Sequence, residues 1–293
     1  MSHLDFIKSV KADWPEAAQI ATTSLFENQG KLPANTVAQL CDLLNCNVGE
    51  LLPQLLPVAE ALALANLSNF QVGCVAMGNQ PNENGIPDLF LGTNIEYPNA
   101  PLTTAIHAEQ CVSSIARFHG QQLTSLALNV PPCGICRQFL YEFSENQPLP
   151  IQIGTEITSL DKLLPNAFGP SDLIEDLSSE QINNLAATNE ENEAELAKIA
   201  KVQAYAPYSK SPTSCIVNWN GQQAVGFSIE NAAFNPSINA FSVAICIARM
   251  SDPNFNLSQI DSASIDTETV GYRYEAQLLL GFCNPRAILS RFP

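Results

Sequence analysis

Residues 123–139 read LTSLALNVPPCGICRQF, and this stretch decides the fold class. The apolar run from Leu123 to Val130 predicts a buried strand, and the spacing over 134–143 predicts a helix directly after it. The rest of residues 58–156 continues the alternation. We expect strands over 70–77, 88–94 and 150–156 and helices over 58–67 and 104–118. Alternating helices and strands predict a layered α/β domain.

Composition excludes several classes of partner. The chain has 293 residues and 46% hydrophobic residues, enough to bury a core, and its formal net charge is -16. Binding to a nucleic acid polymer needs a basic surface that releases counterions, and no cluster of lysines or arginines occurs here. The same acidic balance opposes attraction to an anionic membrane surface.

The chain shows no targeting or membrane signal. Its first residues, MSHLDFIKSVKADW, lack the apolar run of a secretory signal, and no stretch reaches the roughly 18 apolar residues of a membrane helix. We therefore expect a cytoplasmic protein in which most of the nine cysteines are reduced. Core packing is expected for seven of them: Cys41, Cys46, Cys74, Cys111, Cys215, Cys246 and Cys283.

The chain divides into four segments by composition. Residues 1–50 have helical periodicity, 51–170 carry the alternating pattern, 171–198 are acidic and polar like a linker, and 199–293 form a second domain.

The second domain repeats part of the first. LGTNIEYPNAPLTTAIHAE (91–109) is similar to VGFSIENAAFNPSINAFSVA (225–244). Matching Pro101 with Pro236 places Ser242 opposite His107 and Ala244 opposite Glu109. We predict a duplicated domain whose second copy has lost its central polar residues. The alternative is chance similarity between two α/β segments.

Two motifs carry the chemistry. His107-Ala108-Glu109 lies at a predicted helix start, and Pro132-Cys133-Gly134-Ile135-Cys136 lies between the strand and helix described first. His107, Cys133 and Cys136 offer the imidazole and thiolate ligands that zinc favours, and three protein ligands leave a fourth position for water. Helix N-termini also stabilise thiolates and other negative charge.

The combination H-x-E…P-C-x-x-C is the signature of zinc deaminases, in which the glutamate is not a ligand but moves protons. Glu109, two residues from His107, takes that role here. Two other interpretations of the cysteine motif remain open: a structural zinc site completed by Cys111 or His119, and a redox pair.

With these motifs, the chain resembles the long-chain, homodimeric bacterial cytidine deaminases. The strings that carry the resemblance are SNFQVGCVAMG, GTNIEYP, HAEQ, PPCGICRQF, LLPNAFGP and ENAAFNP. It implies a three-layer α-β-α domain that is duplicated, with one zinc ion per chain. It also implies hydrolysis of cytidine and deoxycytidine to uridine and deoxyuridine in pyrimidine salvage, by attack of zinc-bound hydroxide at C4.

The resemblance also implies substrate contacts. Asn94 and Glu96 correspond to ribose-binding residues, Phe70 to an aromatic against the pyrimidine, and the backbone of Ala108 to a contact with the base. Phe168 corresponds to an aromatic that reaches the neighbouring subunit's site, and ENAAFNP to a segment that completes the partner's pocket. From the residues alone, Phe70 is also compatible with a core position and Phe168 with a loop plug.

Three other functions stay open: a deaminase of another base or of dCMP, a zinc-stabilised binding protein, and a nucleic-acid editing deaminase, which the acidic composition disfavours. A nucleotide substrate calls for cationic groups. Arg137, beside the second cysteine, is interpreted as charge compensation for the thiolates.

Overall fold

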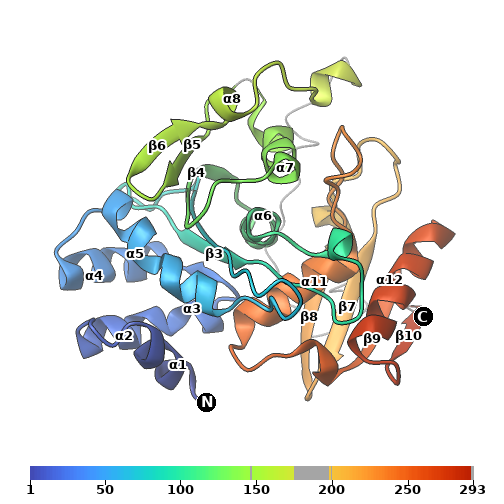
Figure 1. Cartoon of the computed structure of the whole chain (residues 1–293), viewed down its shortest axis with the longest axis horizontal. Coiled ribbons are helices and arrows are strands. Elements are labelled where there is room, and N and C mark those ends of the chain that lie inside the picture. The colour runs from blue at the N-terminus through green and yellow to red at the C-terminus, as the bar shows by residue number, and fades with distance from the viewer. Residues whose placement is uncertain (146, 175–197, 199, 292–293) are drawn as a thin grey trace.

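The computed structural model (Figure 1) describes residues 1–145, 147–174, 198 and 200–291. Its strands are β1 Lys31–Leu32, β2 Gly73–Gly78, β3 Leu89–Thr93, β4 Leu123–Leu128, β5 Pro150–Ile153, β6 Glu156–Ser159, β7 Ser214–Trp219, β8 Gln222–Phe227, β9 Ile260–Asp266 and β10 Ile288–Arg291. They form two sheets, ordered β1-β3-β2-β4-β5-β6 and β10-β9-β7-β8.

Helices accompany both sheets, which confirms the predicted α/β class (Figure 1). They are α1 His3–Val10, α2 Glu16–Thr22, α3 Ser24–Glu27, α4 Ala34–Leu44, α5 Val48–Ala61, α6 Ala108–Phe118, α7 Gly134–Ser144, α8 Leu160–Leu163, α11 Ala240–Ser251 and α12 Val270–Cys283. Short 3-10 turns lie at Leu102–Thr104, Pro170–Asp172 and Leu257–Gln259. Helices α6 and α11 contact each other at the centre and are buried almost throughout their length.

The two sheets repeat one topology. Strand β2 pairs antiparallel with β3 and β4, and β4 pairs parallel with β5; β7, β8, β9 and β10 repeat these pairings. In both copies a glycine lets the central helix pack directly on a strand. A Cβ added to Gly92 would lie 2.4 Å from the backbone nitrogen of Val112, and one added to Gly226 would lie 2.1 Å from the carbonyl oxygen of Ala240, so neither position has room for a side chain. The predicted duplication is therefore present in the fold.

The structure corrects the predicted alignment of the two copies. Isolated bridges join Ile95 to Ile106 in the first copy and Ile229 to Ile238 in the second. The connection is eleven residues long in the first copy and nine in the second, by the difference of these numbers. The alignment that matched Pro101 with Pro236 did not allow for this shorter connection. It therefore aligned the central helix of the second copy three residues out of register with that of the first.

The corrected alignment changes which residues replace the motif. His107 is the N-cap of α6, and Asn239 is the N-cap of α11. Asn239, rather than Ser242, therefore occupies the position of His107, and Phe241 occupies that of Glu109.

The N-terminal 50 residues are mainly helical, as predicted, with one addition. Strand β1 pairs antiparallel with β3, so this segment adds an edge strand to the first sheet. Its helices pack against α5 and α11, which joins it to the core.

The predicted helix over 58–67 is wrong in its bounds. Helix α5 runs over Val48–Ala61 and continues through Pro53 and Pro57. Asn47 and Glu50 form a capping box that starts it, and its apolar face packs on β2. This packing outweighs the penalty of roughly 3 kcal/mol for a proline inside a helix. The prediction began the helix only after Pro57.

Other boundaries move for local reasons. The strand expected over 70–77 begins only at Gly73, as β2. The strand expected over 150–156 divides into β5 and β6 at a turn where Gly154 has a φ of 60°. The helix expected over 104–118 begins at Ala108, after the 3-10 turn Leu102–Thr104. Of the predicted linker 171–198, residues 175–197 lie outside the described residues.

Two buried arginines link the copies reciprocally. The Nε of Arg117, in α6, donates to the carbonyl oxygen of Gln203 at 2.7 Å, and the Nε of Arg249, in α11, donates to that of Leu62 at 2.6 Å. Both side chains are at least nine-tenths buried. Burial lowers the pKa of each guanidinium to about 10, so both stay charged at neutral pH.

The cysteines are free thiols, and five of the seven outside the CxxC motif are buried: Cys74, Cys111, Cys215, Cys246 and Cys283. Cys41 and Cys46 are half-buried beside the end of α4. Among the helices that the structure describes, none has the length and apolar character needed to span a bilayer.

His119 is expected to make the fold acid-sensitive. Its ring stacks on Phe90, and burial lowers its pKa to about 4 from the ordinary value of 6.5. Between these pH values the unfolded chain binds a proton that the folded chain does not. The free energy of unfolding therefore falls as the pH drops below about 6.5, and His119 accounts for up to about 2 kcal/mol of that loss at pH 5.

Urea unfolding at pH 7 and pH 5 measures this effect. The His119→Gln variant cannot titrate at this position, so its free energy of unfolding should fall less than that of the unaltered chain. Equal losses in both proteins contradict the prediction.

Candidate active site

The three predicted metal ligands come together at the starts of two helices. His107 is the N-cap of α6, and Cys133 is the N-cap of α7, which also carries Cys136 in its first turn. His107 Nδ1 lies 3.5 Å from Cys133 Sγ and 3.3 Å from Cys136 Sγ, and the two sulfurs are 3.4 Å apart. Among the histidine, cysteine, aspartate and glutamate side chains of the described residues, these three form the one cluster that could hold a metal ion.

These distances fit zinc. A tetrahedral ion with bonds of about 2.3 Å to sulfur and about 2.0 Å to nitrogen separates its ligand atoms by roughly 3.5–3.8 Å. The three measured separations lie within a few tenths of an ångström of that range. A Cys₂His set with one further position open is also a donor set of catalytic zinc sites.

The thiols favour a divalent cation electrostatically. Hydrogen bonds from Cys136 and His107 lower the pKa of Cys133 to about 3. The pKa of Cys136 is raised instead, by its hydrogen bond to Cys133 and by burial. The pair therefore holds one thiolate readily and resists a second. Positive charge between the sulfurs is what permits both to ionise.

Glu109 lies beside the cluster, in the first turn of α6, and its residue is only 4% exposed. Burial raises its pKa, while contacts with Cys136 and His107 act in the opposite direction. A buried carboxyl with a raised pKa accepts a proton more readily than an exposed one, as a general base must.

A cavity of about 340 Å³ opens over the cluster. It brings together eight of the nine predicted site residues: Phe70, Asn94, Glu96, His107, Ala108, Glu109, Cys133 and Cys136. Seven further lining residues were missed in the sequence: Ser68, Val72, Leu102, Ala105, Ile106, Val130 and Pro131. Their only sequence signal was proximity to the motifs, because most are small or apolar.

Asn94 and Glu96 shape the pocket wall through backbone contacts. Asn94 accepts from the N–H of Val72 at 2.8 Å and donates to the carbonyl oxygen of Phe70 at 2.8 Å. Glu96 accepts from the N–H of Leu67 at 2.7 Å. Burial opposes ionisation of Glu96, but these bonds and those from Ser68 outweigh it and lower the pKa of the carboxyl.

The two predicted aromatics lie in different places. Phe70 lines the cavity and is 57% exposed, so the alternative of a core position is wrong. Phe168 is 45% exposed and does not line its own chain's cavity; its carbonyl oxygen accepts from the side chain of Gln138 at 2.7 Å.

Arg137 does not contact the thiolates through any hydrogen bond found in the structure. Its guanidinium donates to the carbonyl oxygens of Pro132, at 2.9 Å, and Leu163, at 3.0 Å. The residue thus fastens the cysteine loop to the segment that leads to Phe168, and its interpretation as charge compensation for the cysteine sulfurs stays a prediction.

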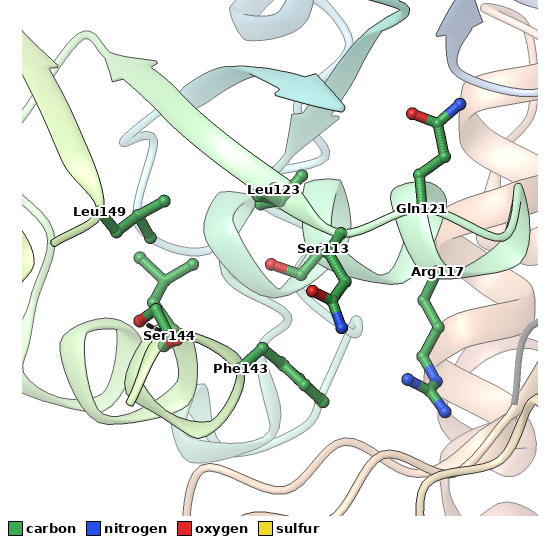
Figure 2. Close-up of a pocket in the computed structure, with 9 residues that line it drawn as sticks. Ser113, Arg117, Gln121, Leu123, Phe143, Ser144 and Leu149 are labelled. Atoms are coloured by element: carbon green, nitrogen blue, oxygen red, sulfur yellow. Dashed lines mark hydrogen bonds between the residues drawn. The ribbon is translucent and has the colours of Figure 1, made fainter. Parts of the chain in front are cut away.

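A second cavity, between α6 and α7, is too small for a substrate. Figure 2 shows Ser113 and Arg117 from α6 and Phe143 and Ser144 from α7 around it. Its volume of about 30 Å³ is that of roughly one water molecule.

The equivalent site in the second copy is filled. Its residual cavity measures about 10 Å³ and is lined by Asn239, Phe241 and Tyr272, among others. Asparagine is no substitute for a zinc-binding imidazole, and Phe241 puts an apolar ring where Glu109 stands in the first copy. The second copy therefore lacks both the ligands and the space.

The structure argues against a closed structural zinc site. Cys111 is fully buried and belongs to no metal cluster in the described part of the chain, and His119 lies at the opposite end of α6. Neither supplies a fourth ligand.

Comparisons with known proteins agree with this geometry. Models of the cytidine and deoxycytidylate deaminase zinc-binding region match residues 50–148 and, separately, 160–268. The cytidine deaminase of Shewanella pealeana is 33% identical over 273 residues, covering 91% of this chain and 89% of that protein. The cytidine deaminase of Proteus mirabilis is 34% identical over 87% of each chain, and that of Serratia proteamaculans 39% over 67% of each.

The chain belongs to the cytidine and deoxycytidylate deaminase family. The two separate matches confirm the duplication, and the match to a zinc-binding region, together with the His107, Cys133 and Cys136 cluster, confirms zinc as the metal. The chain is therefore a zinc-dependent deaminase.

Metal analysis tests the ligand set. The purified chain should hold about one zinc ion, because the described residues offer a single ligand cluster, and Cys133→Ala should hold almost none, because two donors bind zinc far more weakly than three. Atomic absorption measures both. Two ions per chain, or zinc retained in the variant, would contradict the assignment; Cys215→Ala, which removes a buried thiol elsewhere, is the control.

Proposed function

We propose that this deaminase hydrolyses cytidine and deoxycytidine to uridine and deoxyuridine, with release of ammonia. The observation that carries the proposal is the buried Glu109 beside the cluster of His107, Cys133 and Cys136, in the lining of a cavity of nucleoside size. Relatives named cytidine deaminase cover most of this chain and support the choice of substrate.

The cavity wall provides the binding surface. Phe70 offers an exposed ring for the pyrimidine face, and Asn94 and Glu96 offer polar edges for the sugar hydroxyls. The N-terminus of α6, at Ala108, turns backbone N–H groups toward the same cavity, where they suit the base carbonyl.

Proton transfer falls to Glu109. Zinc, when bound by His107, Cys133 and Cys136, supplies the Lewis-acid chemistry that makes water a nucleophile near neutral pH. Glu109 would take a proton from the attacking water, deliver one to the ring nitrogen N3, and assist protonation of the leaving amine. Water would add at C4 and the exocyclic C4–N4 bond would break, which balances as cytidine plus water giving uridine plus ammonia.

The lining disfavours a nucleotide substrate. No lysine or arginine is among the residues that line the cavity, so a 5′-phosphate meets no fixed positive charge there. We infer that dCMP is a poorer substrate than either nucleoside.

Replacing Glu109 tests the mechanism. Glu109→Ala, and the closer isostere Glu109→Gln, should fold and keep zinc but lose about 10²–10⁴-fold in kcat, because Glu96, the other carboxyl that lines the cavity, is held by backbone N–H groups and lies outside the metal cluster. Absorbance assays with cytidine, deoxycytidine and dCMP measure the loss, beside a zinc determination. Turnover near that of the unaltered chain would exclude Glu109 as the proton carrier.

We also infer a homodimer in which each pocket is completed by the partner. Three phenylalanines project from this chain without packing into its core: Phe70, Phe168 and Phe234, exposed by 57%, 45% and 65%. Phe234 also adopts a φ of 61°, a conformation that a bulky residue rarely holds without a compensating contact. Burial of these rings against a second copy provides one.

Dilution tests the dimer. Specific activity should fall as the chain dissociates, and the concentration at half activity should match that at which sedimentation detects monomers. Phe234→Ser should raise both concentrations together, because it removes an apolar contact. A fully active monomer would contradict this inference.

Two further expectations from the sequence, that the protein acts in the cytoplasm and that it serves nucleoside salvage, stay predictions.

A further inference from the structure

We propose that the metal-free second copy positions the zinc ligand His107, and that Gln110 is the residue that connects them. The inference rests on the proposed role of His107 as a ligand. It assigns a function to the second copy that needs no metal, no pocket and no substrate of its own.

The amide of Gln110 bridges the two copies. Gln110 is the third residue of α6 and is 6% exposed. Its Oε1 accepts from the backbone N–H of His107 at 3.0 Å, and its Nε2 donates to the carbonyl oxygen of Pro236 at 2.9 Å. Pro236 lies in the second copy, in the loop before α11. One planar amide therefore ties the ligand's backbone to the other half of the molecule.

The contact requires an amide. One end of the side chain must accept a hydrogen bond and the other must donate one, and the residue is only 6% exposed. A glutamate at position 110 can still accept from His107, as in a capping box, but turns an oxygen toward the carbonyl of Pro236. This difference separates the helix-capping role of Gln110 from its connection to the second copy.

The bond bears on the metal because His107 is an N-cap. Its backbone is extended, with φ of -89° and ψ of 154°, and its N–H belongs to no helical hydrogen bond. Gln110 fixes that N–H and so the direction in which the imidazole leaves the chain. A change of a few tenths of an ångström at Nδ1 matters, since the ligand atoms stand only 3.3–3.5 Å apart.

A corresponding contact runs in the other direction, from the central helix of the second copy to the first copy. The residue equivalent to Gln110 in the second copy is Ser242, whose hydroxyl forms a buried hydrogen bond of 2.8 Å with the hydroxyl of Tyr97. Each helix start is therefore joined to the loop of the other copy. In the first copy alone, the chain of contacts continues to a metal ligand.

Zinc release is the decisive measurement. Gln110→Leu removes both hydrogen bonds, and Gln110→Glu keeps the cap and loses the connection to Pro236. The matched control is Gln19→Leu: Gln19 is also 6% exposed and also makes two hydrogen bonds, to the carbonyl oxygens of Lys11 and Trp14 in the N-terminal segment. Each zinc-loaded full-length protein is mixed with a chromogenic chelator at one pH, and release is followed by absorbance.

Both Gln110 variants should release zinc about 10-fold faster or more than the unaltered chain, as expected when the support of a ligand is lost. The added negative charge of Gln110→Glu by itself favours retention of a cation, so faster release from that variant isolates the broken connection. Gln19→Leu should lower the melting temperature and leave the release rate unchanged.

Three results would overturn the inference: unchanged release from both Gln110 variants, unchanged release from Gln110→Glu alone, or equally fast release from Gln19→Leu. The second means that the cap acts without the other copy, and the third means that general stability sets the rate. His107→Ala separates these results from a failure of the ligand assignment. If that variant keeps its zinc, His107 is not a ligand; if it loses zinc while the Gln110 variants do not, only the present inference fails.

Discussion

The reciprocal pair of buried arginines is the constraint that makes one structure of two copies. A buried guanidinium is strongly destabilising unless its N–H groups find acceptors. Arg117 and Arg249 find theirs on the carbonyl oxygens of Gln203 and Leu62, each in the opposite copy. Separation of the halves would leave both charges without these acceptors and would expose the almost wholly apolar helix α11. The second copy is therefore retained by the physics of the fold, even though its own site is filled.

The active site is built on this core in a simple way. Helices α6 and α7 begin at His107 and Cys133, so the ligands stand where each helix presents unpaired N–H groups and positive potential. Each helix is also held from the other side. Glu142, late in α7, accepts hydrogen bonds from Tyr205 at 2.8 Å and from the N–H of Ala232 at 2.7 Å, both in the second copy. Helix α6 thus lies between the sheet of its own copy and a loop of the other, and α7 packs on α6 and is held by the second copy through Glu142.

Local patterns explain what the sequence could predict. The ligands and Glu109 follow from spacing within single turns, and the strand and helix that flank the cysteines follow from short apolar periods. Features set by tertiary packing were missed. Helix α5 passes through Pro53 and Pro57 because its buried face holds it on β2, which no proline rule anticipates. The shortened loop before α11 appears only when the bridges of Ile229 are compared with those of Ile95, so the alignment by proline went wrong at that helix.

The two copies also distinguish what the fold requires from what the chemistry requires. Glu230 accepts hydrogen bonds from two successive backbone N–H groups, of Tyr208 and Ser209, as Glu96 does in the first copy. The equivalent cavity of the second copy measures only about 10 Å³ and is not lined by Glu230, so these bonds support a loop and cannot by themselves mark a sugar site. His107 and Glu109 behave differently, since their counterparts are an asparagine cap and an apolar plug. Residues of the first copy that are replaced in the second copy, where the pocket is closed, serve the reaction. Residues that are the same in both copies serve the fold. Glu96 is kept in both copies, so its backbone hydrogen bonds serve the fold, while in the first copy alone it also lines an open cavity.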